Sequence, residues 1–426
     1  MLKFHHFNLA AWLRLWLRIG IVVAAAASAS AQPALTWEQV RLRFEQRNPT
    51  LLAGKLSIDE SKAEEITANL RPNPILSFGV DQIDPFNGGP PHSTFGSLLM
   101  TANASYLHER QHKRELRLES AKEGTAIAVS SQDDLERNLL FNLRGAFVGT
   151  LQAKAVLNMA RENLAYYDHV LDISRERYKA GDIAEIDLDR LELQRVQFES
   201  DLQTAEVNLR TEKIQLLMLL NDRTPVEQLD VTGLFDFDDQ IAPLDDFRKI
   251  AVDTRPDLRA AIQAVDKAKT DHKLALANGS TDPTFGFDVG RNPPIDQYIG
   301  FNVSIPLRVF DRNQGEKLRT QLDIDRNQKL LDAAQAQVFS DVDSAYATLT
   351  SNVILLRPYK AKYLQQAVHV RETVTFAYQH GGASLLDFLS AENDYRSVQL
   401  NYVNLVGSYL ISASQLNLAV GREVIQ

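Results

Sequence analysis

The sequence predicts a mainly α-helical protein with a small β part, in which a helix, a β-hairpin and a long helical hairpin occur twice. Three observations predict this class: a tandem duplication, short segments of strand-like alternation, and long amphipathic stretches with little proline. Hydrophobic residues make up 44% and charged residues 24% of the chain, which is typical of an ordered protein. No cysteine is present, so we expect neither disulfides nor thiolate metal sites.

Residues 1–31 are expected to be a cleavable secretory signal peptide. A positively charged region leads into a short apolar core at 19–27, and Ala29-Ser30-Ala31 is a small-x-small cleavage site. The positive residues are Lys3, Arg14 and Arg18. The apolar core is too short to span a bilayer of about 30 Å comfortably. We therefore expect an exported chain that starts near Gln32 and, without a cysteine, is not a lipoprotein.

The two halves of the chain resemble each other at an offset of roughly 200 residues, a period that implies two copies of one substantial structure. Tyrosine, glycine and aspartate recur in the same order in both halves: Tyr178, Gly181 and Asp187, then Tyr378, Gly381 and Asp387. An Asn48-Pro49 pair and an Arg255-Pro256 pair open equivalent helices. The predicted organisation is a first repeat at 32–221, a connector at 222–246 and a second repeat at 247–426.

Two strands are expected in each half, at about 74–82 and 96–107 and at about 283–290 and 297–306. In the clearest of them, Phe285, Phe287 and Val289 alternate with small or polar residues. A soluble hairpin would pack its apolar face on a helix, whereas a membrane barrel would turn that face to lipid. Four strands cannot close a barrel, so insertion into a bilayer would require several copies of the chain to share one.

Two long helical stretches are expected, at 110–178 and 312–378, and Pro358 is expected to bend the second. Gly181 and Gly381 follow these stretches, where glycine suits the left-handed backbone that reverses the chain. Asp187 and Asp387 then begin the return helices. One interpretation is that each aspartate caps its helix or compensates the helix dipole. Another is that, multiplied by symmetry at the tip of a tube, it belongs to a carboxylate ring that selects cations, and both interpretations can hold together.

The duplication, strands and turns together resemble the TolC-like outer-membrane efflux proteins, also called outer membrane factors. The resemblance implies a homotrimer with a shared barrel of about twelve strands in outer-membrane lipid and a helical barrel in the periplasm. It also implies that the two Tyr-x-x-Gly…Asp runs form the periplasmic aperture, with Asp387 in the constricting ring and Tyr378 in the closing network. The chain departs from better-known members at Ala383, where they have a gating arginine, and at Ser390, where they have a second ring aspartate.

The run from Ser304 to Gly315 is similar to the barrel-to-helix junction of the cobalt-zinc-cadmium resistance branch of that family. This likeness implies a periplasmic adaptor and an inner-membrane resistance-nodulation-division pump as partners, with divalent metal cations as cargo. The duct itself would conduct passively, with no cofactor and no catalytic residues. A formal charge of −9 argues against a nucleic-acid partner, which needs a basic face.

Two alternatives to the duct remain open on the sequence alone. The first is a soluble periplasmic coiled-coil adaptor or scaffold, which would also contain long helical hairpins but more short strands. The second is a zinc metalloprotease, because His108-Glu109-Arg110-Gln111-His112 satisfies the H-E-x-x-H motif. That motif acts only on a helix, where both histidines share one face, and here it falls where a strand is expected to give way to a helix.

Overall fold

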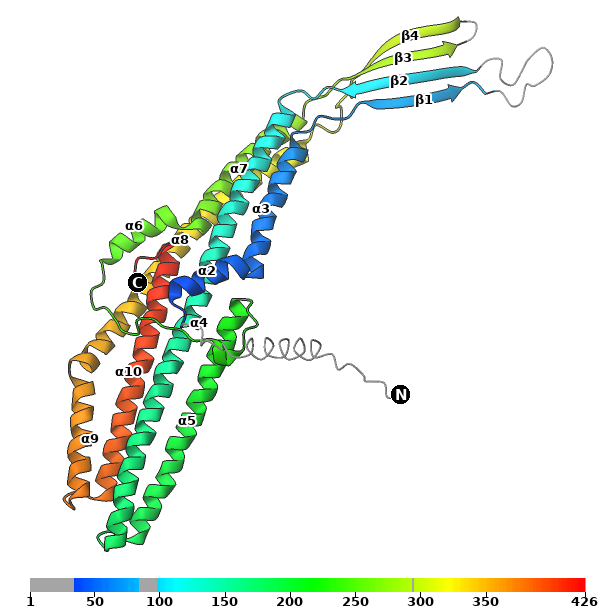
Figure 1. The fold of residues 1–426 in the computed structure, drawn as a ribbon. Coiled ribbons are helices and arrows are strands. Elements are labelled where there is room, and N and C mark those ends of the chain that lie inside the picture. Colours follow the sequence, from blue (N-terminus) through cyan, green and yellow to red (C-terminus); the bar gives the residue numbers. More distant parts are fainter. Residues whose placement is uncertain (1–33, 84–97, 293–294, 426) are drawn as a thin grey trace, which may run out of the picture. The chain divides into compact units, whose positions relative to one another are not determined.

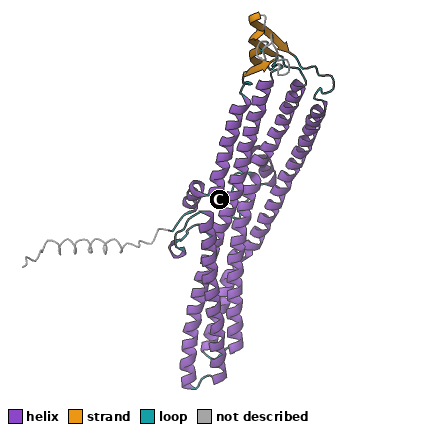
Figure 2. Ribbon diagram, turned by 90° about the vertical axis from the view of Figure 1, so that its right-hand side faces the viewer, coloured by secondary structure: helices purple, strands orange, loops and turns teal. Residues whose placement is uncertain are grey.

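The computed structural model describes residues 34–83, 98–292 and 295–425, and shows long helices with one small β-sheet (Figure 2). The predicted mainly α class with a β part is confirmed. The expected signal peptide at 1–31 lies outside the described residues. The chain forms two compact units, and both are assembled from separate stretches of sequence.

The first unit contains the described residues of 1–44 together with 149–235, and the second contains 45–148 together with 236–426. These units cut across the predicted repeats rather than coinciding with them, so the repeat boundaries stay a prediction. Two helices, α2 (Trp37–Arg47) and α4 (Lys113–Ala180), run through both units. Each unit is described separately below.

The second unit contains an antiparallel sheet of four strands in the order β1-β2-β3-β4. Their bounds are Ile75–Asp81, Leu99–Leu107, Thr284–Asn292 and Ile295–Ser304. The central pairing joins β2 of the first sequence half to β3 of the second, with Ala104 opposite Phe287. The two predicted hairpins are therefore parts of one continuous sheet.

The helices of the second unit are α3 (Pro49–Ala68), α6 (Leu244–Thr254), α7 (Pro256–Asn278), α8 (Gln314–Pro358), α9 (Leu364–Gln379) and α10 (Leu385–Val420). Proline occupies the first turn of both α3 and α7, where its missing N–H costs no helical hydrogen bond. Asn48 caps α3, because its side-chain oxygen accepts the Leu51 N–H at 3.0 Å. In Figure 1 the sheet lies at one end of these helices and the α9–α10 turn at the other.

Pro358 ends α8, and one π-helical turn, Tyr359–Tyr363, leads into α9. The regular α-helix is thus interrupted at the proline where a bend is expected, and a connector segment contacts this π-helical turn. Lys360 forms an ion pair with Asp236 at 2.6 Å and lies 5.1 Å from the centre of the Phe237 ring. Phe237 in turn packs edge-on against Tyr409 of α10. The connector therefore contacts both the π-helical turn and α10.

The carboxyl end of α10 is held by side chains from three other helical regions of its unit. The carbonyls of Leu418, Ala419 and Val420 accept hydrogen bonds from Arg137, Arg255 and Thr254, at 2.7, 3.2 and 2.6 Å respectively. Arg255 is buried and also pairs with Asp257 and Asp341. These donors bind carbonyls of the last turn of α10, where a helix offers few N–H partners of its own.

The first unit contains α5 (Glu185–Leu219), which packs antiparallel along the second part of α4. Its helices meet in an apolar cluster of Leu157, Ala160 and Ala205. A short 3-10 turn, Val226–Gln228, follows α5, and the chain then pairs Val231 with Leu35. Lys154 of α4 holds this segment through an ion pair with Asp230 at 2.8 Å.

No helix in the parts of the chain that the structure describes is both long enough and apolar enough to cross a membrane.

Candidate functional site: a two-faced sheet and two helical turns

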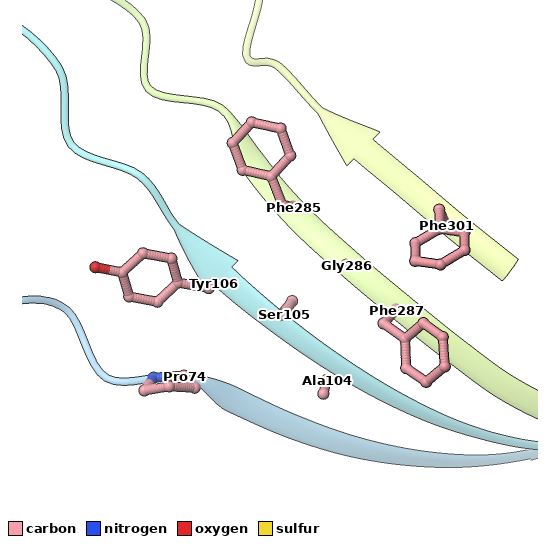
Figure 3. Close-up of a pocket in the computed structure, with 8 residues that line it drawn as sticks. All are labelled: Pro74, Ala104, Ser105, Tyr106, Phe285, Gly286, Phe287 and Phe301. Carbon is pink, nitrogen blue, oxygen red and sulfur yellow. The ribbon is translucent and has the colours of Figure 1, made fainter.

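The sheet presents one apolar face that is exposed in the single chain. The register sets Leu76, Ala104, Phe287 and Phe301 in one row across the four strands. The rings of Phe287 and Phe301 lie 5.3 Å apart, and Phe301 is 85% exposed. Figure 3 shows aromatic side chains from β2, β3 and β4 around a shallow hollow on this part of the sheet. An exposed aromatic surface of this kind is typical of a site that contacts a membrane or another protein.

The opposite face is polar, and Asp288 is at its centre. Asn302 donates a hydrogen bond to one carboxylate oxygen of Asp288 at 2.8 Å, and Asn103 donates to the other. Gly286 leaves space for the Asn302 side chain, because a Cβ added at this glycine would lie 2.4 Å from the side-chain oxygen of Asn302. A sheet with one apolar and one polar face can separate lipid from water.

The sheet is open, since β1 and β4 are its two edges. An edge strand presents unpaired N–H and C=O groups, which water satisfies in a soluble protein but hydrocarbon cannot. In a bilayer, both edges would have to pair with strands of other copies of the chain.

The first helical turn joins α4 to α5 around Gly181, whose φ of +83° confirms the expected left-handed backbone. Its N–H donates to the Tyr178 carbonyl at 2.9 Å, and Tyr178 itself is 39% exposed. The residue before α5 is Ala184, which provides no side-chain cap. Among the described residues, the Asp187 carboxylate has no hydrogen-bond or ion-pair partner. It is a free carboxylate at a helix N-terminus.

The second turn joins α9 to α10 around Gly381, whose φ is +76°. Tyr378 is 5% exposed here, and its ring stacks on Phe388 at 5.1 Å. Ser384 and Asp387 form a capping box: the Asp387 N–H donates to the serine hydroxyl oxygen at 3.2 Å, and the Ser384 N–H donates to the carboxylate at 3.0 Å. The interpretation that Asp387 caps its helix is therefore confirmed.

The electrostatics of the two aspartates differ accordingly. Hydrogen bonds from the hydroxyl and the backbone N–H of Ser384 hold the pKa of Asp387 below its usual value. One oxygen of Asp387 accepts both of these bonds, which leaves the other oxygen available to solvent. The two turns belong to different units, so a shared carboxylate ring stays a hypothesis.

The H-E-x-x-H run does not have the geometry of a zinc protease. His108 follows β2 in an extended segment, His112 has a φ of +55°, and α4 begins only at Lys113. The two histidines therefore do not share a helix face. Glu109 pairs with Arg117 at 2.5 Å, which occupies the group that would act as general base. Across residues 34–83, 98–292 and 295–425, no cluster of three or more metal-ligating side chains is present.

Two features of the turns were not predicted from the sequence. The Ser384 cap has a recognisable signal, because serine followed three residues later by an acid opens many helices. The buried carboxyl of Glu392, further along α10, had no such signal, since burial of one helix face against another is decided by packing.

Comparison with known proteins shows which families and structures this chain is similar to. Residues 248–422 match the model of the outer membrane efflux protein family. The cobalt-zinc-cadmium resistance protein CzcC of Cupriavidus metallidurans is 21% identical over 383 residues, which cover 88% of this chain and 87% of that protein.

Solved structures show the same fold over nearly the whole chain. CusC superposes with a TM-score of 0.77 at 16% identity, covering 91% of this chain and 92% of its own. The outer membrane protein VceC of Vibrio cholerae has a TM-score of 0.74 at 15% identity, covering 91% of this chain and 96% of its own. With its two helical hairpins and two-faced sheet, the chain has the fold of these outer membrane channels, and its residues 248–422 are similar to the outer membrane efflux protein family.

Proposed function

We propose that this protein is the outer-membrane duct of a tripartite efflux system and works as a homotrimer. The open, two-faced sheet at the end of long helices carries this proposal. Three copies would pair β1 of one chain with β4 of the next, which gives a barrel of about twelve strands with no free edge. The apolar face would meet lipid, and the polar face around Asp288 would line an aqueous lumen.

The cargo that we propose is divalent metal cations. CzcC is by its name a cobalt-zinc-cadmium resistance protein, and its likeness extends over most of both chains. A periplasmic adaptor and an inner-membrane resistance-nodulation-division pump would supply the energy and the substrate. The duct conducts passively, so we assign it no enzymatic activity. The N-terminal signal peptide would direct export, and the helices would extend into the periplasm.

The helical turns are the proposed periplasmic aperture, with Tyr178, Gly181 and Asp187 in one and Tyr378, Gly381 and Asp387 in the other. In a trimer each aspartate would occur three times around the axis, which is the usual device for attracting cations. Asp187 has both oxygens free, whereas Asp387 shares one with Ser384. The first-repeat carboxylate is therefore expected to contribute at least as much to selectivity as the second.

Genetics and fractionation test the function. A strain that lacks the gene should become more sensitive to zinc, cobalt or cadmium, and the protein should fractionate with the outer membrane as a heat-resistant trimer on SDS gels. Recovery as a soluble periplasmic protein would instead support the adaptor alternative. Unchanged sensitivity to metals, with increased sensitivity to organic drugs, would overturn the cargo but leave the duct.

Single-channel recordings test the aperture. Asp187→Asn and Asp387→Asn should each lower the preference for cations over anions, with Asp187→Asn having an effect as large or larger. Asp182→Asn is a matched control in the first turn, because it removes a nearby carboxylate that does not begin a helix. If neither variant at 187 nor at 387 changes selectivity, the carboxylate ring is wrong.

A further inference from the structure

Glu392 is a buried carboxyl group without a partner. It lies about two helical turns into α10, which begins at Leu385, and only 2% of the residue is exposed. Neither carboxylate oxygen has a hydrogen-bond partner among the described residues. A buried ionised carboxylate that is not hydrogen-bonded is costly, so such a group keeps its proton or moves to water.

The surroundings of Glu392 offer little compensation for its charge. Among the described residues, the charge that acts on Glu392 is that of Arg371 on α9, whose guanidinium lies 3.7 Å from the ring centre of Tyr395. On its own helix, Tyr395 and Arg396 lie one turn farther along, and burial lowers the pKa of Arg396. The helices α8 and α6 meet α10 farther along, at Ser412 and Val420.

The equivalent residue of the first repeat behaves differently. Glu192 is half-exposed on α5 and forms an ion pair with Arg175 at 3.0 Å. The same residue type at the same repeat position is therefore an ordinary surface ion pair in one hairpin and an unpaired interior group in the other.

We propose that Glu392 is a proton-controlled latch of the α9–α10 hairpin. In its neutral form the carboxyl stays packed inside the hairpin and keeps the helices together near Gly381. Loss of the proton creates a charge that only water or a counter-ion can stabilise, so α9 and α10 separate around it. Any effect of this separation on conduction rests on the proposed duct function. The separation itself is a property of the α9–α10 hairpin.

The direction of the pH dependence follows from the burial. Burial raises the pKa of Glu392 from its ordinary 4.5 to about 7, although the charge of Arg371 acts in the opposite direction. The packed hairpin therefore binds a proton that the opened hairpin releases between these two values. Its stabilisation is complete below the ordinary value and is lost as the pH rises through about 7.

A distance measurement in the full-length protein tests the latch. The chain has no cysteine, so Thr373→Cys on α9 and Asn393→Cys on α10 introduce two unique and exposed sites for nitroxide labels. Double electron–electron resonance measures the distance between the two labels. Between pH 5 and pH 8.5 this distance should lengthen by several ångström, or its distribution should broaden. Glu392→Gln, which cannot ionise, should keep the short distance at every pH.

Matched variants keep the test decisive. In Glu192→Gln the label distance should change with pH as it does in the wild-type protein, because this variant alters the equivalent but exposed carboxyl. If Glu392→Gln does not fold, Glu392→Met removes the same charge with a similar volume and should also keep the short distance. A wild-type distance that does not change with pH, or an equal change in Glu392→Gln, would overturn the latch. The distances do not depend on metal resistance, so failure of the proposed cargo would leave this result intact.

Discussion

The two helical turns have the same backbone but are secured by different side chains. Both reverse the chain at a glycine of positive φ whose N–H donates to the tyrosine carbonyl three residues earlier. In the second turn, the Ser384 capping box and the Tyr378–Phe388 stack lie directly beside the glycine. In the first turn, the α4–α5 hairpin has its aromatic stack farther away, between Tyr167 and Phe198 at 4.4 Å.

From this difference we infer different mechanical roles for the two hairpins. A capping box and an aromatic stack stabilise the turn at Gly381, whereas the first turn leaves its tyrosine exposed and has no side-chain cap. The first hairpin is instead stabilised along its length, where the buried Tyr167 hydroxyl donates to the Leu191 carbonyl at 3.0 Å. We therefore expect the second turn to be the element whose opening is controlled.

The largest effect is expected from removing the two aromatic anchors, Phe198 and Phe388, which are both buried. Substitution by alanine should cost about 3–5 kcal/mol in either case, because each leaves a large cavity. Phe388→Ala should also increase proteolysis at the second turn at temperatures where the rest of the chain stays folded. Phe198→Ala should not increase cleavage at the first turn. If both turns were equally protected from proteolysis in both variants, the two hairpins would not differ in mechanical role as proposed.

A smaller and equal effect is expected at the two turn glycines. Gly181→Ala and Gly381→Ala should each destabilise the protein by roughly 1–2 kcal/mol, the cost of a left-handed backbone for a residue with a Cβ. No neighbouring atom lies within 4 Å of a Cβ added at either position, so backbone strain is the whole effect. Thermal unfolding measures both variants. Clearly unequal costs would mean that the two turns differ in backbone as well as in side chains.

The smallest effect is expected at the caps, which can be exchanged between the turns. Ser384→Ala should destabilise the second hairpin by about 1 kcal/mol, the usual value for a lost N-cap, and Ala184→Ser should stabilise the first by up to a similar amount. Chemical denaturation of the two variants measures both changes. No gain from Ala184→Ser would show that the first turn cannot adopt the capping geometry.

The cap also has a pH dependence with a defined sign. Ser384 lowers the pKa of Asp387 below its ordinary 3.8. The ionised Asp387 therefore contributes fully to the stability of the folded protein above pH 3.8, and this contribution is lost as the pH falls through the lower pKa of the folded state. Ser384→Ala should therefore weaken the acid-sensitive part of the stability profile. An unchanged profile below pH 4 would show that Asp387 does not depend on this cap.

Much of the fold could be predicted because its signals are local. Helix starts follow from proline in the first turn at Pro49 and Pro256, the helix break follows from Pro358, and both reversals follow from glycine. The strands follow from alternation of period two, which needs only neighbouring residues. The position of each site residue along the chain is local information of the same kind.

Only the tertiary structure decided how these elements are used. It joined the two predicted hairpins into one sheet through β2 and β3, a pairing between residues about 180 apart in sequence that no local pattern specifies. It also buried Glu392, while the equivalent Glu192 stayed half-exposed and paired with Arg175. The sequence by itself therefore determined the duplicated architecture, since periodicity and turn chemistry act over a few residues. Burial and charge at single carboxylates depend on which helix faces meet, and that is a property of the packed molecule.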